Sequence, residues 1–259
     1  MHLVNVSPWP CIIVVAALNT AGGAVISWHF NCSINTKIGL TLLTFILFIW
    51  WFDMFKENTG GFHNAIVSFG FRFGMALFIS SEVLFFSAFF WAYFHNCWHP
   101  NEDVGGDWTS EEYGKVVLDP FGLPLLNTLI LLFSGITVTA AHHTLLQNQT
   151  FVSDCFLILT IILGVYFLFL QSQEYVSSGF SGNSSAYGTL FFFLTGFHGL
   201  HVTVGAILLS MVLFRQGSGN LTEGKHVFFE SAAWYWHFVD VVWIFLYFFI
   251  YWYGFDLPS

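Results

Sequence analysis

Charged residues are scarce in this sequence. Of its 259 residues, Asp, Glu, Lys and Arg together make up only 8%, against about 25% in a typical soluble domain. Only six residues are Lys or Arg, and the formal net charge is −9. A chain with so few charges cannot cover a water-soluble domain with a polar surface. The shortage therefore excludes an ordinary soluble domain, an intrinsically disordered chain and a nucleic-acid-binding protein.

Cysteine is also scarce. The four cysteines, Cys11, Cys32, Cys97 and Cys155, are widely separated and form neither a CxxC pair nor the spacing of a disulfide framework. The first residues carry neither the basic start of a secretory signal peptide nor the Arg-rich pattern of a transit peptide. We therefore expect the first apolar segment to remain in the chain as a helix.

Apolar and aromatic residues are abundant in this sequence. They make up 56% and 21% of the chain, with 34 Phe and 11 Trp. A membrane-spanning helix needs about 20 mostly apolar residues, and these segments are apolar on every side, unlike barrel strands, which alternate. The sequence predicts an all-α integral membrane protein, one transmembrane domain over residues 1–259. Its seven expected transmembrane helices cover approximately residues 11–28, 38–55, 73–94, 125–144, 152–171, 187–214 and 228–253.

The connections between these helices suggest their grouping and orientation. A linker from Lys56 to Arg72 divides the expected helices into a two-helix unit and a five-helix unit. The basic residues on one side are Lys56, Arg72, Arg215 and Lys225, and those on the other side are Lys37 and Lys115. The positive-inside rule then places the N-terminus inside. The acidic connection over residues 101–119 lies outside.

Five titratable residues are expected at a similar depth near the middle of the membrane: Glu82, His198, His201, His237 and Asp240. An ionisable group there costs roughly 2.5–3.5 kcal/mol, so each needs a reason. A proton path, a lipid or ion site, and metal or haem ligation are the functional alternatives. Hydrogen bonding between helices is the structural alternative, and we favour it for the histidines and Asp240. For Glu82, the only charged residue in its segment, both interpretations stand.

Other histidines and the basic connections suggest further sites. His142 and His143 do not match the expected depth of the mid-membrane histidines, which disfavours a haem between them. His95 and His99 have the spacing of a metal pair on a helix, but anchoring at the membrane interface explains them better. Basic residues at helix ends can hold anionic lipid headgroups, or they serve only to set the topology. Among the function classes, a secondary transporter and a haem-bearing membrane cytochrome remain as alternatives, although no internal repeat is visible.

Several long motifs resemble cytochrome c oxidase subunit III. They are the segments 72–75, 81–86, 90–95, 124–128, 141–143, 171–175, 196–202 and 233–243, together with the opening Ser-Pro-Trp-Pro of residues 7–10. The resemblance covers nearly the whole chain. Two departures are a proline-poor, acid-rich connection over residues 101–119 and Ala140 where a Trp is usual in the family.

The resemblance implies a fold and an assembly. It implies that the two-helix and five-helix units enclose a V-shaped cleft filled with phospholipids. It further implies that the chain lies against catalytic subunit I of the oxidase, among other subunits of the complex and within a respiratory supercomplex. Haem a and copper would belong to partner subunits, so this chain would hold no metal and no catalytic residue. The implied location is the mitochondrial inner membrane with the N-terminus on the matrix side, or alternatively a bacterial plasma membrane.

The resemblance also assigns roles to residues. Glu82 corresponds to the family's carbodiimide-reactive intramembrane carboxylate, and carbodiimides attack neutral carboxyl groups in apolar surroundings. Lipid contact is carried onto five residues: Glu57, His63, Arg72, Arg215 and Lys225. The family is credited with supporting proton uptake, with protecting the catalytic subunit during turnover and with oxygen access through the cleft.

Overall fold

The computed structural model describes residues 6–61, 64–100, 108 and 118–256, and these are almost entirely helical. The elements are α1 (Trp9–Phe30), α2 (Ile34–Thr59), α3 (Ala65–Trp98), α4 (Leu123–Leu146), α5 (Thr150–Ser177), α6 (Ala186–Gly217), α7 (Val227–Leu246), the π-helical turn η3 (Tyr247–Trp252) and α8 (Tyr253–Asp256). Within the described ranges, seven helices are long and apolar enough to cross a membrane. The predicted all-α class with seven spans is confirmed.

The largest difference from the expected boundaries is at α3. It was expected over residues 73–94 but runs for 34 residues, from Ala65 to Trp98. Residues 66–73 are mostly apolar and contain no proline, so nothing stops the helix there. Asn64 begins the helix, because its Oδ1 accepts a hydrogen bond from the N–H of Val67 at 3.0 Å. Arg72 therefore lies inside α3 and not in a linker, which corrects its expected position.

The chain forms two compact units, residues 1–70 and 71–259. In the first unit α1 packs along α2. Their backbones approach closely, since a Cβ added to Gly23 would lie 2.5 Å from the backbone nitrogen of Thr36. The indole nitrogen of Trp9 donates a hydrogen bond to Asp53 at 2.6 Å. Small residues and one polar pair thus hold this helical hairpin together.

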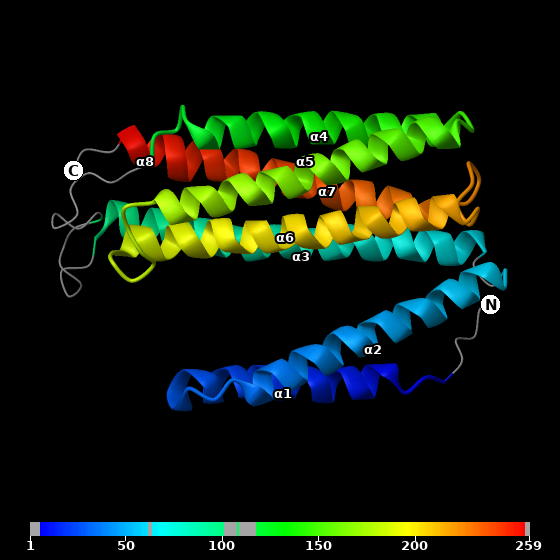
Figure 1. The fold of residues 1–259 in the computed structure, drawn as a ribbon, viewed down its shortest axis with the longest axis horizontal. Coiled ribbons are helices and arrows are strands. Elements are labelled where there is room, and N and C mark those ends of the chain that lie inside the picture. Colours follow the sequence, from blue (N-terminus) through cyan, green and yellow to red (C-terminus); the bar gives the residue numbers. More distant parts are fainter. Residues whose placement is uncertain (1–5, 62–63, 101–107, 109–117, 257–259) are drawn as a thin grey trace. The chain divides into compact units, whose positions relative to one another are not determined.

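In the second unit α4, α5, α6 and α7 pack in sequence, and α7 returns to contact α4 (Figure 1). The buried ring of Trp236 on α7 is at their centre. A Cβ added to Gly164 of α5 or to Gly205 of α6 would lie 2.5 or 2.8 Å from this ring. The Trp236 indole N–H donates to Ser134 of α4 at 2.9 Å. One side chain therefore joins all four helices.

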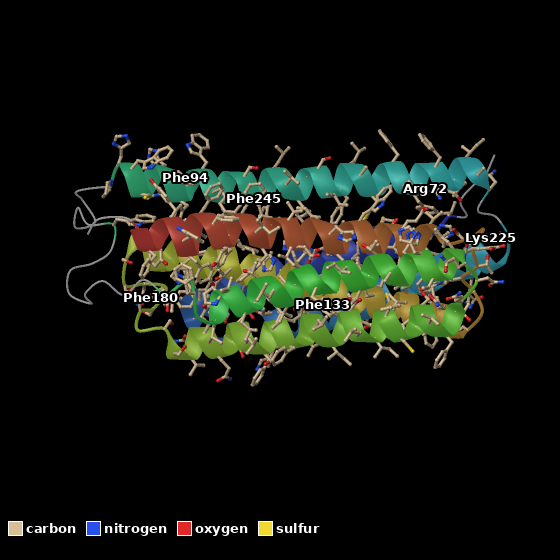
Figure 2. All side chains as sticks on the ribbon, turned by 90° about the horizontal axis from the view of Figure 1, so that it is seen from above. Arg72, Phe94, Phe133, Phe180, Lys225 and Phe245 are labelled. Atoms are coloured by element: carbon tan, nitrogen blue, oxygen red, sulfur yellow. The ribbon has the colours of Figure 1, made fainter. Side chains whose placement is uncertain are left out.

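Helix α3 contacts the rest of the second unit mainly through aromatic rings. Phe85 lies edge-on to Phe197 of α6 with ring centroids 5.1 Å apart. Phe94 meets Phe249 of the π-helical turn at the same centroid distance, 5.1 Å. Figure 2 shows Phe94 near one end of α3 and Arg72 near the other. Side chains thus hold the long helix along its length. Its backbone lies farther from the neighbouring helices than the backbones of α4 and α5 lie from each other.

Candidate functional site

The Glu82 carboxyl on α3 contacts a histidine on α6. Its Oε2 atom lies 2.8 Å from Nε2 of His201, and the two side chains are 22% and 11% exposed. The other ring nitrogen of His201, Nδ1, lies 2.6 Å from the carbonyl oxygen of Phe197. A carbonyl oxygen can only accept, so Nδ1 must carry a hydrogen. Therefore the hydrogen bond between Glu82 and His201 contains one proton, which sits either on the carboxyl or on Nε2.

Aromatic rings surround this pair. The ring of Phe86 lies edge-on to the His201 ring with centroids 5.0 Å apart, and the Tyr235 ring stacks on it at 6.3 Å. Such a wall limits contact with water and strengthens the hydrogen bond it encloses. Glu82 was expected as the only charged residue of its segment. The structure adds His201 as its partner.

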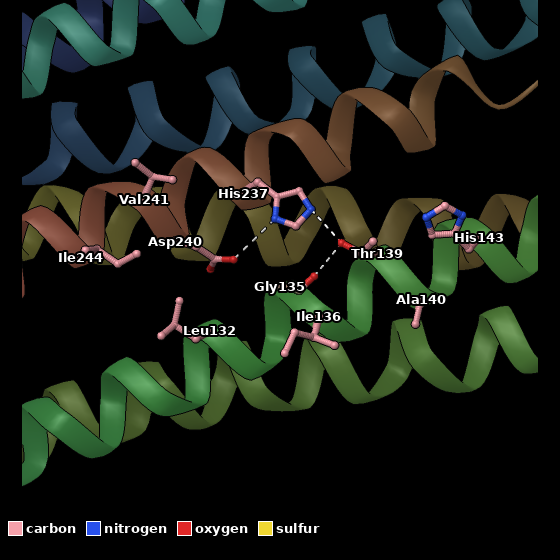
Figure 3. A pocket seen from close by; sticks show the side chains of 10 residues that line it. All are labelled: Leu132, Gly135, Ile136, Thr139, Ala140, His143, His237, Asp240, Val241 and Ile244. Carbon is pink, nitrogen blue, oxygen red and sulfur yellow. Dashed lines mark hydrogen bonds and ion pairs between the residues drawn. The ribbon is translucent and has the colours of Figure 1, made fainter.

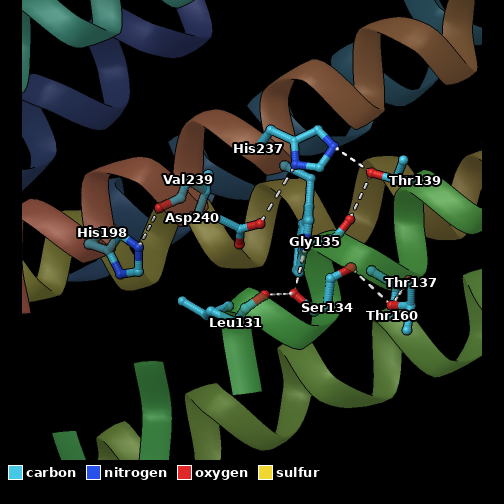
Figure 4. Close-up of polar contacts among 11 residues, drawn as sticks. Leu131, Ser134, Gly135, Thr137, Thr139, Thr160, His198, His237, Val239 and Asp240 are labelled. Atoms are coloured by element: carbon cyan, nitrogen blue, oxygen red, sulfur yellow. Dashed lines mark hydrogen bonds and ion pairs between the residues drawn. The ribbon is translucent and has the colours of Figure 1, made fainter. Parts of the chain in front are cut away.

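In each of the other two mid-membrane histidines, one ring nitrogen also forms a hydrogen bond. His198 is 1% exposed, and its Nε2 lies 3.2 Å from the carbonyl oxygen of Val239, to which it must donate. His237 places Nε2 3.1 Å from the hydroxyl of Thr139 on α4. Figure 4 shows both contacts beside the buried Ser134 and Thr137 hydroxyls of α4. Each of these histidines links two helices of the second unit.

Asp240 is nearly buried next to His237. Its Oδ2 lies 3.9 Å from Nδ1 of His237, which is too long for a hydrogen bond. Its Oδ1 is buried without a hydrogen-bond partner among the described residues. Gly135 of α4 makes room for this carboxyl, because a Cβ there would lie 2.6 Å from Oδ2. The i,i+3 spacing of His237 and Asp240 thus places their side chains near each other without a hydrogen bond between them.

An open pocket of about 560 Å³ lies between α4 and α7 over this pair. Figure 3 shows its polar residues, Thr139, His143, His237 and Asp240, among apolar neighbours. The apolar lining comes from Leu132, Ile136, Ala140, Val241 and Ile244, with Gly135 beside them. The five predicted mid-membrane residues therefore do not form one site. They form separate contacts, at Glu82 with His201, at His198 with Val239, and at His237 with Thr139.

The residues expected to contact lipid have different surroundings. The Nε atom of Arg72 donates to Oε2 of Glu230 on α7 at 2.6 Å, with the Arg72 side chain 40% exposed. Arg215 is only 8% exposed, and its guanidinium lies 5.3 Å from the ring centroid of Phe228. Lys225 is exposed.

The two remaining residues of this set are Glu57 and His63. Glu57 is half-buried on α2. His63 lies outside the described residues. Both assignments to lipid contact stay predictions.

A buried carboxyl that was not among the predicted site residues lies at the end of the unit where α4 begins and α5 ends. Glu174 on α5 is 1% exposed, and its Oε2 accepts from Tyr251 at 2.7 Å and from Gln171 at 2.8 Å. Gln171 in turn accepts a 3.3 Å hydrogen bond from Asn127 of α4. The fifth span was expected to end at Gln171, which left Glu174 outside it. Gln171 and Glu174 are three residues apart, about one helical turn, and this spacing was the sequence signal for a contact between them.

The π-helical turn η3 positions Tyr251 for this network. Residues 247–252 form it, and Tyr247, Ile250 and Tyr251 are buried there. A π-helical turn is rare and shifts the face that the following side chains present. Hydrophobic periodicity cannot reveal such a shift, so the contact between Tyr251 and Glu174 was not predictable from spacing.

Among the described residues, seven apolar helices are long enough to cross a membrane, and α3, α6 and α7 carry paired ionisable groups; together these features define a polytopic helical membrane protein. Comparison with known proteins then gives the family. The sequence profile of cytochrome c oxidase subunit III matches residues 1–255. The chain belongs to the cytochrome c oxidase subunit III family, whose members are subunits of a respiratory oxidase, and the resemblance stated above is confirmed.

The relatives extend over almost the full length of the chain. The proteins named cytochrome c oxidase subunit 3 from Scyliorhinus canicula, Latimeria chalumnae and Rattus norvegicus are 49%, 48% and 46% identical to it. Each alignment spans 254 residues, which is 98% of this chain and 97% of the relative. Partner subunits of an oxidase complex follow from membership of this family.

Proposed function

We propose that this chain is a non-catalytic core subunit of cytochrome c oxidase, the terminal oxidase that couples electron transfer from cytochrome c to oxygen with proton pumping. It stabilises catalytic subunit I, while haem a and copper are held by partner subunits. Its place is the mitochondrial inner membrane, with the N-terminus on the matrix side.

One observation carries this proposal: ionisable side chains within the spans bind across helices. Glu82 binds His201 between α3 and α6, and Arg72 binds Glu230 between α3 and α7. His198 also has a ring nitrogen engaged inside the unit. These contacts favour a rigid scaffold over a redox or transport site, because removing His201 or Arg72 would leave a largely buried carboxyl without its partner.

The Glu82 site supports a more specific role for the chain, which is proton uptake. Glu82 and His201 share one proton between two atoms 2.8 Å apart, and a neutral carboxyl is one of the two states of that pair. This is the state that carbodiimides modify. The pair therefore supports Glu82 as the carbodiimide-reactive carboxyl and as a group that holds a proton near the catalytic subunit.

Phospholipid binding is a second specific role of the chain. Arg72 keeps 40% of its side chain exposed beyond its bond to Glu230, and Lys225 is exposed. Cations at the ends of spans attract anionic headgroups. We assign lipid contact foremost to these two residues, with Glu57 and His63, and least to the buried Arg215. The bound lipids would give oxygen a path to the catalytic subunit.

The turnover lifetime of the oxidase tests the stabilising role. Three preparations of the complex are compared: intact, with this chain removed, and with His201→Leu in this chain. We expect similar initial rates of oxygen consumption in all three. We expect activity to be lost severalfold faster without the chain, and faster in the variant than in the intact complex. Equal lifetimes with and without the chain would contradict the proposal.

A further inference from the structure

Three side chains that can bind metals meet where α4 ends and α7 begins. They are His142 in the last turns of α4, His226 at the N-cap of α7 and Glu230 in the first turn of α7. One ligand atom from each lies within 4.8 Å of the others. His226 and Glu230 are four residues apart and share a face of the helix. Packing of α4 against α7 adds His142.

The contacts already present leave donor atoms available. Nε2 of His226 lies 3.2 Å from Oε1 of Glu230. Nδ1 of His226 and Nε2 of His142 are both buried, and neither has a hydrogen-bond partner among the described residues. Leaving a buried polar atom unsatisfied costs about 1–3 kcal/mol. A ligand that accepts an imidazole lone pair would remove that cost at His142.

The two rings are already held near one another. The centroids of His142 and His226 are 5.3 Å apart, and the Phe229 ring lies 5.3 Å from that of His142. Zinc binds imidazole nitrogen and carboxylate oxygen at about 2.0–2.2 Å, so tetrahedral ligands are roughly 3.3 Å apart. Because the present separations do not exceed 4.8 Å, closing them needs a movement of at most about 1.5 Å, which rotation of the half-buried histidine side chains can provide.

Arg72 contacts the Glu230 carboxylate of this cluster through the oxygen that does not contact His226. Its guanidinium binds Oε2 of Glu230 and leaves Oε1 directed toward the histidines. A partner that fixes a ligating carboxylate orients it for the metal, whereas the positive charge weakens the attraction for a cation. We therefore expect a site of moderate affinity.

We propose that His142, His226 and Glu230 bind a divalent transition-metal ion of the zinc class. Two imidazoles and one carboxylate form the donor set that zinc prefers, with water completing four ligands. The bound ion would join α4 to α7 at this end of the unit. This site lies apart from Glu82 and is not needed for the function proposed above.

The experiment counts zinc in the purified oxidase complex. Preparations with the native chain, His142→Gln, His226→Gln and His143→Gln are stripped with a chelator, incubated with zinc chloride and desalted. Zinc per complex is then measured by mass spectrometry. His143→Gln is the matched control, because His143 is the exposed neighbour of His142 and is not part of the cluster. We expect the native and control complexes to hold one more zinc ion than the other two.

Equal zinc content in all four preparations would overturn the proposal. A second measurement needs no substitution. Crystals of the native complex treated with zinc chloride are measured at the zinc absorption edge. We expect an anomalous peak between the His142 and His226 rings. Its absence at full zinc loading would equally overturn the proposal, whether or not the variants assemble.

Discussion

The Nε2 atom of His201 on α6 lies 2.8 Å from Oε2 of Glu82 on α3. Because Nδ1 of the same ring donates to the carbonyl of Phe197, the contact holds one proton between a carboxyl and an imidazole. This proton can move by less than 1 Å without breaking either hydrogen bond of the ring. The pair thus joins two helices through one hydrogen-bonded proton.

Carbodiimide labelling tests the role of Glu82. Glu82→Gln keeps the size and hydrogen-bonding capacity of the side chain, so we expect a folded complex whose α3 is no longer labelled. His201→Leu removes the hydrogen bond that holds the carboxyl, so we expect faster labelling of α3. Peptide mapping of the labelled complex measures both. Persistent labelling of α3 in Glu82→Gln, or unchanged labelling in His201→Leu, would refute the assignment.

The ion pair between Arg72 and Glu230 separates lipid binding from stability. Arg72→Gln removes both the pair and the exposed cation, so we expect the loss of bound anionic lipid together with about 1–2 kcal/mol of stability. Glu230→Gln breaks the pair but keeps the cation, so lipid should remain. Native mass spectrometry counts the lipids, and thermal unfolding measures stability. An unchanged lipid count in Arg72→Gln would count against lipid contact at this residue.

The buried Glu174 network predicts a difference between two substitutions. Glu174→Leu leaves the Tyr251 hydroxyl and the Gln171 amide without their acceptor, at a cost of about 1–3 kcal/mol for each group. Glu174→Gln retains an acceptor oxygen and should lose much less. The thermal midpoint of the complex measures both. Equal midpoints for the two variants would show that the acceptor oxygen at residue 174 does not contribute to stability.

Packing around Trp236 predicts a strong effect from one methyl group. In Gly205→Ala the new Cβ would lie 2.8 Å from the Trp236 ring, and overpacking of this kind costs about 1–3 kcal/mol. Gly74→Ala on α3 is the matched control, because a Cβ there meets no atom within 4 Å in the described structure. We expect a lower yield of assembled complex only for Gly205→Ala. A similar loss for both variants would mean that helix flexibility, and not the contact with Trp236, matters.

The number of spans could be predicted from the sequence because it follows from one-dimensional apolar length. The start of α3 was misplaced by eight residues, at 73 instead of Ala65. Arg72 marked the expected edge of the apolar run, but a charged residue can lie inside a helix when a neighbour pairs with it. That neighbour, Glu230, is 158 positions away in the chain.

Partners between helices could not be predicted, because they depend on how each helix is rotated. Five titratable residues were expected at a similar depth, but depth does not identify partners, and His198 and His201 contact different elements. Tyr251 reaches Glu174 from within a π-helical turn that hydrophobic periodicity does not reveal. His142 and His226 looked unrelated in the sequence and meet only through the packing of α4 on α7.

The distribution of haem between this chain and the rest of the oxidase tests the central claim most directly. The complex is dissociated with detergent, this chain is separated from the remaining subunits, and reduced-minus-oxidised spectra of both fractions are recorded with their copper content. We expect all haem absorbance and copper to remain with the other subunits, with an unchanged spectrum. A Soret band or stoichiometric copper in the fraction that holds this chain would contradict it.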